Sequence, residues 1–227
     1  MLSTRLLALS FLSLGFVVAQ DSECPELPDT GVDFGAPVPM HPEHIPEGCS
    51  DYEILVARGT SEPNFEPDGK FGVVVGDPVV SNVTEVLPGS RGYPVQYPAS
   101  SDIISGIRQG ARDVVNRITS QALRCPNQKF ALVGYSQGAA VMHAAADDLS
   151  RLLYSRIKAL VMFGDSYNRL GLLGRFPTGL NEKATQVCAP GDPVCDSDGS
   201  CTYYHLTYIR PEYIDPAVDF IVEKFTQ

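Results

Sequence analysis

The sequence predicts a three-layer α/β/α sandwich built around a central, mainly parallel sheet. Four apolar runs have the length of a strand, and they lie at residues 52–57, 93–98, 129–134 and 157–163. Helix-like segments separate these runs along the chain. Strands that are apolar on both faces and that alternate with amphipathic helices are typical of a parallel sheet covered on both sides.

The clearest helix is expected over residues 101–123, with Ser101 as the N-cap. Its apolar residues recur at spacings of three and four, which predicts one buried face made of Ile104, Ile107, Ala111, Val114, Ile118 and Ala122. A second helix is expected to close the chain, with Asp215 as the cap and Pro216 in the first turn. Its predicted inner stripe is Ala217, Phe220, Ile221 and Phe225.

The chain divides into three segments. Residues 1–19 have a charged start at Arg5, an apolar run and a small-residue cleavage site after Ala19, which predicts a secretory signal peptide. Residues 20–48 are rich in proline and glycine and form an N-terminal extension, and residues 49–227 form one catalytic domain. No later stretch approaches about 18 uninterrupted apolar residues, so we expect a secreted, extracellular protein without integral membrane association.

Composition narrows the classes of partner and cofactor. A formal net charge of −10 makes nucleic acid and anionic membrane surfaces poor partners. Six cysteines fit an oxidising compartment, and the absence of a CxxC pair disfavours zinc, so no metal and no cofactor are expected. The only glycosylation sequon begins at Asn82.

The stretch "GYSQG" follows the apolar run "KFALV" and precedes the alanine-rich segment "AAVMHAAADDL". Strand, Gly-x-Ser-x-Gly and helix in this order indicate a nucleophile elbow, in which Gly134 and Gly138 allow a sharp turn that presents Ser136. The pentapeptide alone would also suit an ordinary turn. We predict that Ser136 is a nucleophile because of the elements on either side of it.

A serine nucleophile needs a base, and the chain has four histidines. His41 and His44 lie in the extension, and His143 lies two turns along the elbow helix, too far on to fold back to Ser136. His205 comes late in the chain, which matches the order serine, acid, histidine of α/β-hydrolase-like enzymes.

Two aspartates compete for the role of the acid. Asp165 ends a predicted strand, whereas Asp192 lies in a short loop that a Cys188–Cys195 disulfide would stiffen. Asp196 and Asp198 read as solvated loop charges. The chemistry favours Asp192 by a modest margin, because the carboxylate must be held still to orient the imidazole.

Four motifs, "CSDYEILVARGTSEP", "GYSQGAAV", "CAPGDPVC" and "YHLTY", resemble in order and spacing the cutinase family of secreted serine esterases, which includes acetylxylan esterases. The resemblance covers about residues 49–225. It implies a lidless α/β-hydrolase sheet of about five parallel strands. It also implies that Ser136 is the nucleophile, Asp192 the acid and His205 the base. The oxyanion hole is then formed by Thr60 and Gln137.

The resemblance also implies the disulfides Cys49–Cys125 and Cys188–Cys195. The remaining cysteines, Cys24 and Cys201, are then hypothesised to pair, which would tie the extension to the loop that carries His205.

The substrate is predicted to be an ester of short to medium acyl chain, including an insoluble polyester such as cutin. The segment "RLGLLGRFPTGL" offers Leu170, Leu172, Leu173, Phe176 and Leu180 for an apolar wall. The segment before His205, "DSDGSCTYY", is instead polar and aromatic, and its Tyr203 and Tyr204 would stack on sugars or pack. The alternatives are an acetylxylan esterase acting on acetylated polysaccharide, and a non-catalytic secreted surface-binding protein. The resemblance implies a monomer.

Overall fold

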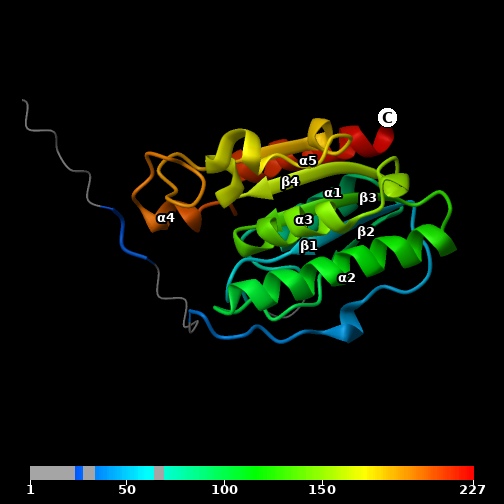
Figure 1. The fold of residues 1–227 in the computed structure, drawn as a ribbon, viewed down its shortest axis with the longest axis horizontal. Coiled ribbons are helices and arrows are strands. Elements are labelled where there is room, and N and C mark those ends of the chain that lie inside the picture. Colours follow the sequence, from blue (N-terminus) through cyan, green and yellow to red (C-terminus); the bar gives the residue numbers. More distant parts are fainter. Residues whose placement is uncertain (1–23, 28–33, 64–68) are drawn as a thin grey trace, which may run out of the picture.

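The computed structural model describes residues 24–27, 34–63 and 69–227. Within them lies one five-stranded parallel sheet of order β2-β1-β3-β4-β5 (Figure 1). The strands are β1 (Tyr52–Ala57), β2 (Ser90–Pro94), β3 (Lys129–Tyr135), β4 (Ile157–Phe163) and β5 (Ala184–Val187). The predicted three-layer fold is therefore confirmed.

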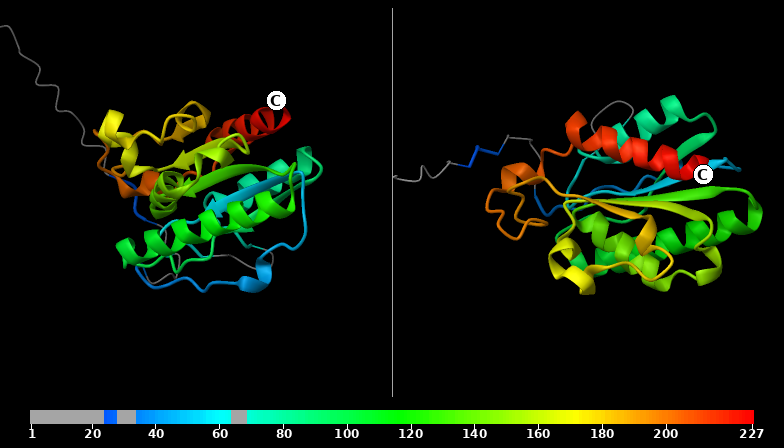
Figure 2. Two further views of the ribbon diagram at one scale, coloured as in Figure 1. Left: turned by 45° about the vertical axis from the view of Figure 1, so that its right-hand side comes forward. Right: turned by 90° about the horizontal axis from the view of Figure 1, so that it is seen from above.

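Helices cover both faces of the sheet (Figure 2). The α-helices are α1 (Gly76–Val86), α2 (Ile103–Arg124), α3 (Gln137–Asp148), α4 (Thr202–His205) and α5 (Pro211–Thr226). Short 3-10 helices are η1 (Pro42–His44), η2 (Arg151–Leu153), η3 (Ser166–Gly174) and η4 (Asn181–Lys183). Helices α2 and α3 pack on one face of the sheet, and α1 and α5 pack on the other.

Neighbouring residues of each central strand point into opposite cores, as the two-residue period of a strand requires. In β3, Leu132 packs with α2 and α3, whereas Val133 packs with α1 and α5. Both side chains are fully buried. This explains why the central strands appear in the sequence as uninterrupted apolar runs.

Two predicted helix starts are wrong. Helix α2 is capped by Asp102, whose carboxylate accepts a hydrogen bond from the Ser105 N–H at 3.3 Å, and the expected core residue Ile104 is 68% exposed. Helix α5 begins at Pro211, so that Pro216 lies inside it. The inner stripe extends back to Ile214, which is buried, and this burial stabilises an additional turn before the proline.

Residues 34–48 of the extension run alongside α2 (Figure 1). One point of its attachment is built around Glu53, a fully buried carboxylate of β1. Arg91 and Arg117 each bind this carboxylate, at 2.7 and 2.6 Å. Arg117 also donates to the Pro46 carbonyl at 3.0 Å. The two guanidinium groups therefore link the extension to the sheet while they satisfy a charge that would be costly to bury alone.

All five strands end at the same edge of the sheet, and this edge carries the candidate site. The chain passes from β1 to β2 on one side and returns to β3 on the other side of β1. Open α/β sheets bind their ligands beyond the carboxyl ends of the strands at such a reversal. The segments that follow β1 and β3 contain Thr60 and Ser136.

The six cysteines form three disulfides, Cys24–Cys201, Cys49–Cys125 and Cys188–Cys195. In the described part of the chain, no helix has both the length and the apolar character needed to cross a membrane. The predicted signal peptide, residues 1–19, lies outside the described residues.

Candidate active site

Ser136 occupies the turn between β3 and α3 in a strained backbone conformation. Its φ is 54° and its ψ is −117°, a region that residues with a side chain rarely adopt. A Cβ at Gly138 would lie 1.9 Å from the Ala57 carbonyl oxygen, and a Cβ at Gly134 would lie 2.6 Å from the Gly138 carbonyl oxygen. Only glycine fits at either position, so the two glycines of the motif allow α3 to begin directly against the end of β1.

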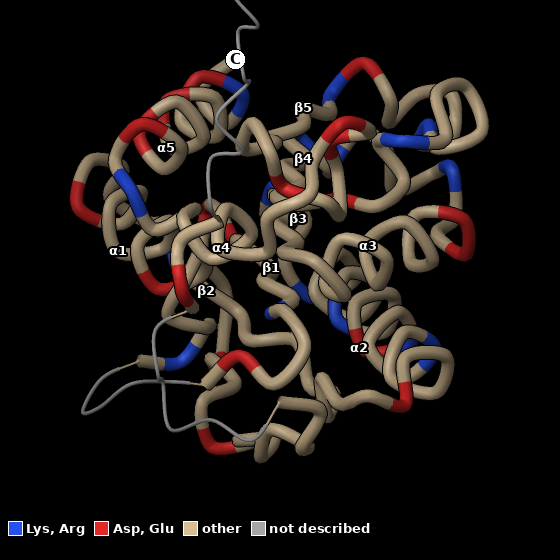
Figure 3. The backbone as a smooth tube through the Cα atoms, turned by 90° about the vertical axis from the view of Figure 1, so that its left-hand side faces the viewer, with Lys and Arg blue, Asp and Glu red and all other residues tan. Residues whose placement is uncertain are grey.

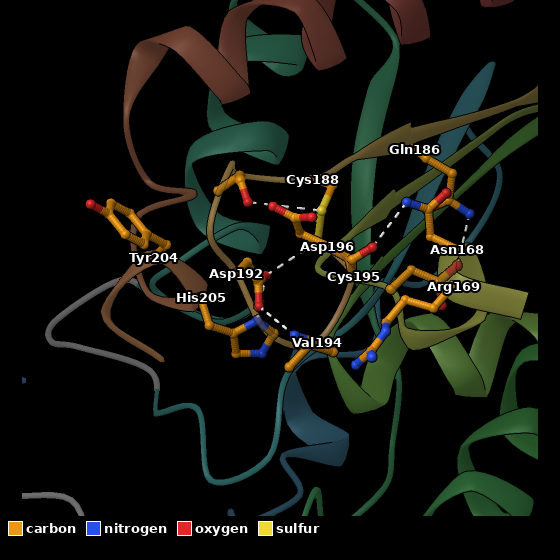
Figure 4. Close-up of a disulfide and its surroundings, with 12 residues drawn as sticks. Asn168, Arg169, Gln186, Cys188, Asp192, Val194, Cys195, Asp196, Tyr204 and His205 are labelled. Atoms are coloured by element: carbon orange, nitrogen blue, oxygen red, sulfur yellow. Dashed lines mark hydrogen bonds and ion pairs between the residues drawn. A yellow bond between two sulfur atoms is a disulfide. The ribbon is translucent and has the colours of Figure 1, made fainter. Parts of the chain in front are cut away.

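His205, which is partly buried, and Asp192, which is fully buried, form a close pair (Figure 4). The His205 Nδ1 lies 2.8 Å from the Asp192 Oδ2, and the side chains are 11% and 0% exposed. Burial alone would raise the pKa of Asp192, but hydrogen bonds from His205, Tyr208 and the Val194 N–H hold that pKa below its usual value. The acid therefore stays ionised, and its negative charge faces the imidazole.

Tyr135 connects this pair to the serine. Its hydroxyl donates to the His205 carbonyl at 2.7 Å, and the two rings lie 5.1 Å apart. Ser136 is the next residue in the chain. Among the described residues no hydrogen bond joins Ser136 to His205, and such bonds are often long in free enzymes and tighten when substrate binds.

The loop that holds Asp192 is stiffened from several directions. The Cys188–Cys195 disulfide closes it. The carboxylate of Asp196 accepts from the Gly191 N–H at 2.8 Å and from the Asp198 N–H at 3.0 Å, so Asp196 shapes the loop rather than carrying a merely solvated charge. Cys201, at the start of α4, joins Cys24 of the extension, as hypothesised.

The rival acid and the nearest other histidine bind each other. His143 Nε2 lies 2.8 Å from Asp165 Oδ2, and the same oxygen accepts from Gln186 Nε2 at 2.7 Å. The His143 ring is stacked between Tyr167 and Phe176, with centroids 4.2 and 3.9 Å away. His143 and Asp165 are buried, and their contacts with each other and with Tyr167 anchor η3 to α3.

The other two histidines lie in the extension. His41 precedes η1 and His44 is its last residue, and His41 Nδ1 lies 2.7 Å from Glu43 Oε1. Neither histidine contacts Asp192, Ser136 or their loops in the described part of the chain.

The predicted oxyanion residues also meet. The Thr60 hydroxyl donates to the Gln137 Oε1 at 3.3 Å, and the Gln137 Nε2 donates to the Ser100 carbonyl at 3.3 Å. Gln137 is the first residue of α3, where backbone N–H groups have no partner within the helix. The helix dipole adds positive potential at the same point.

Glu62 holds the Thr60 loop in place, and sequence reasoning missed this role. Its carboxylate is buried and accepts from the Gly59 N–H and the Val74 N–H, each at 2.7 Å. Burial raises the pKa of Glu62 to about 7, although the two N–H donors and the Arg58 charge oppose the rise. The motif "ARGTSEP" contained the residue, but its distant partner at Val74 gave no signal in the sequence.

Charged residues do not form a basic face at this end of the molecule. Figure 3 views the carboxyl edge of the sheet and shows Lys and Arg positions scattered among Asp and Glu positions. The described residues thus offer no basic stripe for a polyanion in this view, in line with the net charge of −10.

We expect Glu62 to make the free energy of unfolding depend on pH, so that the protein becomes less stable as the pH rises from about 4.5 to 7. In this window the folded protein binds the Glu62 proton and the unfolded chain does not, and the difference amounts to about 3 kcal/mol. The measurement is urea denaturation of the wild type and Glu62→Gln at several pH values. A stability difference between the two proteins that does not change between pH 4 and 8 would contradict this expectation.

Comparison with known proteins agrees with the geometry. The cutinase family model matches residues 48–225. The cutinase of Hypocrea jecorina strain QM6a is 38% identical over 179 residues, which is 77% of this chain and 67% of that protein.

Two solved structures show the same fold. The structure of a Trichoderma reesei cutinase in complex with a phosphonate inhibitor superposes with a TM-score of 0.65 at 33% identity and covers 87% of this chain and 82% of that one. An acetylxylan esterase superposes with a TM-score of 0.65 at 26% identity and covers 78% of this chain and 100% of that one. The chain belongs to the cutinase family of serine esterases and is a carboxylic ester hydrolase.

Proposed function

We propose that Ser136 is the nucleophile, His205 the general base and Asp192 the acid of a secreted esterase. The observation that carries this proposal is the 2.8 Å pair between His205 and Asp192 at the edge of the sheet where the strained elbow presents Ser136. Asp165 does not suit the role of the acid, because His143 and Gln186 already occupy its carboxylate.

The proposed reaction has two halves. Ser136 Oγ attacks the ester carbonyl while His205 Nε2 takes the serine proton, and the imidazolium then gives that proton to the leaving alkoxide as the ester bond breaks. Water then attacks the acyl-enzyme while His205 takes its proton. The imidazolium gives that proton to Ser136 Oγ as the carboxylic acid product is released. Asp192 orients the ring and stabilises the imidazolium, and it does not take up the proton itself.

The oxyanion of each tetrahedral intermediate is proposed to bind the backbone N–H groups of Gln137 and Thr60. Both residues lie where β1 and β3 end, and Gln137 starts a helix. The Thr60 hydroxyl is engaged with the Gln137 side chain, which fixes the spacing of the two segments. A single donor of this kind contributes about 3 kcal/mol to the transition state.

Exposed leucines support an aliphatic acyl substrate presented at an interface. Leu170, Leu172 and Leu173 of η3 are 53%, 75% and 88% exposed. Segment η3 borders the acid loop, since the Asn168 side chain donates to the Cys195 carbonyl at 3.2 Å. The expected wall is narrower than the sequence indicated, because Phe176 and Leu180 are buried in the core.

The contacts of Tyr203 and Tyr204 support a packing role for these rings over stacking on sugars. Tyr203 and Tyr204 pack edge to face with centroids 5.7 Å apart, and the Tyr203 hydroxyl accepts from Arg210. We therefore propose esters of short to medium acyl chain, including aliphatic polyesters, ahead of acetylated polysaccharide. Extracellular release, a monomeric state and glycosylation at Asn82 belong to the same proposal, and the three disulfides support an oxidising location.

Initial rates on p-nitrophenyl esters from acetyl to palmitoyl test the substrate class. We expect the highest kcat/KM at butyryl or longer, because a longer chain buries more apolar surface against the leucines, at about 0.8 kcal/mol per methylene. Ser136→Ala provides the blank. A steep fall after acetyl would favour a small acyl pocket and acetylated polysaccharide, and no rate above the blank would favour a binding protein.

Two matched variants test the identity of the acid. Asp192→Asn is expected to lower kcat by about 10³- to 10⁴-fold with little change in KM, because the imidazole loses its charged partner. Asp165→Asn is expected to lower thermal stability and to leave kcat within about tenfold of the wild type. The reverse pattern would assign the acid to Asp165.

A further inference from the structure

Tyr208 lies behind the His205–Asp192 pair, in the segment between α4 and α5. It is fully buried. Its ring packs edge to face against Tyr135, Phe163 and Tyr213, with centroids 5.8, 5.8 and 5.4 Å away, and lies 6.2 Å from the His205 ring. These contacts come from β3, β4 and α5, so the phenol is held in one orientation.

The Tyr208 hydroxyl donates to the acid. Its other polar neighbours are the Ala189 N–H and Cys195 Sγ, a disulfide sulfur 3.3 Å away that is only a weak acceptor. It accepts from the Ala189 N–H at 3.1 Å, which occupies its acceptor side, and its own proton goes to Asp192 Oδ2 at 2.5 Å. Burial raises the pKa of the phenol, and the bond to Asp192 raises it further, so the proton stays on Tyr208 at any working pH.

Tyr208 and His205 share one oxygen of the carboxylate. Asp192 Oδ2 accepts from both side chains, at 2.5 and 2.8 Å, while Oδ1 accepts from the Val194 N–H at 2.8 Å. With donors on both oxygens the carboxylate cannot rotate. A hydrogen bond to a carboxylate also disperses its charge, so less of that charge acts on the imidazole.

We propose that Tyr208 is a positioning residue that fixes the Asp192 carboxylate and weakens its pull on the His205 proton, so that the base is free at lower pH. This inference rests on the triad proposed above. A base that is free at lower pH can accept the serine proton over a wider range of conditions.

The effect of removing the hydroxyl follows from the groups that face the pair. The titratable and charged side chains around it are Tyr135 of β3, Tyr213 of α5, Tyr204 of α4, Asp196 of the acid loop and Arg169 of η3, which donates to the Pro193 carbonyl. The Cys188–Cys195 disulfide does not titrate. None of these side chains loses a bond in Tyr208→Phe. The variant removes one donor from Asp192 and one acceptor from the Ala189 N–H. The imidazolium then faces more negative charge and is stabilised.

The experiment measures kcat and KM from pH 4.5 to 9 on a soluble p-nitrophenyl ester, read at the isosbestic wavelength of nitrophenol. For Tyr208→Phe we expect the acidic limb of the pH profile of kcat/KM to shift to higher pH by about 0.5 to 1 pH unit. We also expect kcat on the plateau to fall about 3- to 30-fold with KM within about twofold. Tyr213→Phe, which alters a ring that packs on Tyr208, is the matched control and should keep the wild-type limb.

If the acidic limb of Tyr208→Phe stays at the wild-type pH or shifts to lower pH, the inference is overturned. This holds even if the variant is less stable or slower, because loss of packing alone does not move the titration of the base. If Tyr208→Phe fails to fold, Tyr208→Met provides the second test, since it also removes the hydroxyl that donates to Asp192 and should shift the limb to higher pH. If Ser136→Ala or Asp192→Asn keeps activity, the proposed triad itself is wrong. This result distinguishes a failure of the triad from a failure of the inference about Tyr208.

Discussion

The close approach of the α3 backbone to the end of β1 is the constraint on which the site depends. Gly138 passes so near the Ala57 carbonyl that no side chain fits between them, and Gly134 is crowded in the same way. This contact forces the turn that leaves Ser136 at a positive φ. It also brings the first N–H groups of α3 beside Thr60. One backbone contact therefore places both the proposed nucleophile and the proposed oxyanion donors.

Buried carboxylates perform the remaining organisation, each with its own set of donors. Glu53 receives two arginines and attaches the extension, whereas Glu62 receives two backbone N–H groups and supports the Thr60 loop. Asp165 is matched to His143, and Asp192 is matched to His205 and Tyr208. A buried charge is costly unless it is paired, so each of these acids fixes the position of the groups around it.

Much of the fold could be predicted because the central strands are buried on both faces and leave an apolar run in the sequence. Strand β5 left no such run, since "ATQV" is a half-exposed edge strand, and only the resemblance to cutinases implied a fifth strand. The cap of α2 at Asp102 and the start of α5 at Pro211 differ from the prediction by one and by several residues, because tertiary burial and local caps decide helix ends.

The parts of the candidate site that consist of neighbouring residues in the sequence could be predicted. The elbow around Ser136 and the disulfide-closed loop around Asp192 each occupy a few consecutive residues. Glu62 and Tyr208 were missed because their partners, Val74 and Asp192, are distant in sequence. No spacing rule connects such pairs, and only the folded chain brings them together.

Covalent labelling with a serine-directed alkyl phosphonate tests whether Ser136 is the nucleophile. We expect that one phosphonyl group is added per chain, that the modified peptide contains Ser136, and that esterase activity is lost in proportion to labelling. Ser136→Ala should remain unmodified under the same conditions. Labelling that persists in Ser136→Ala, or a folded wild-type protein that hydrolyses esters yet resists the reagent, would contradict the assignment of Ser136 as the nucleophile.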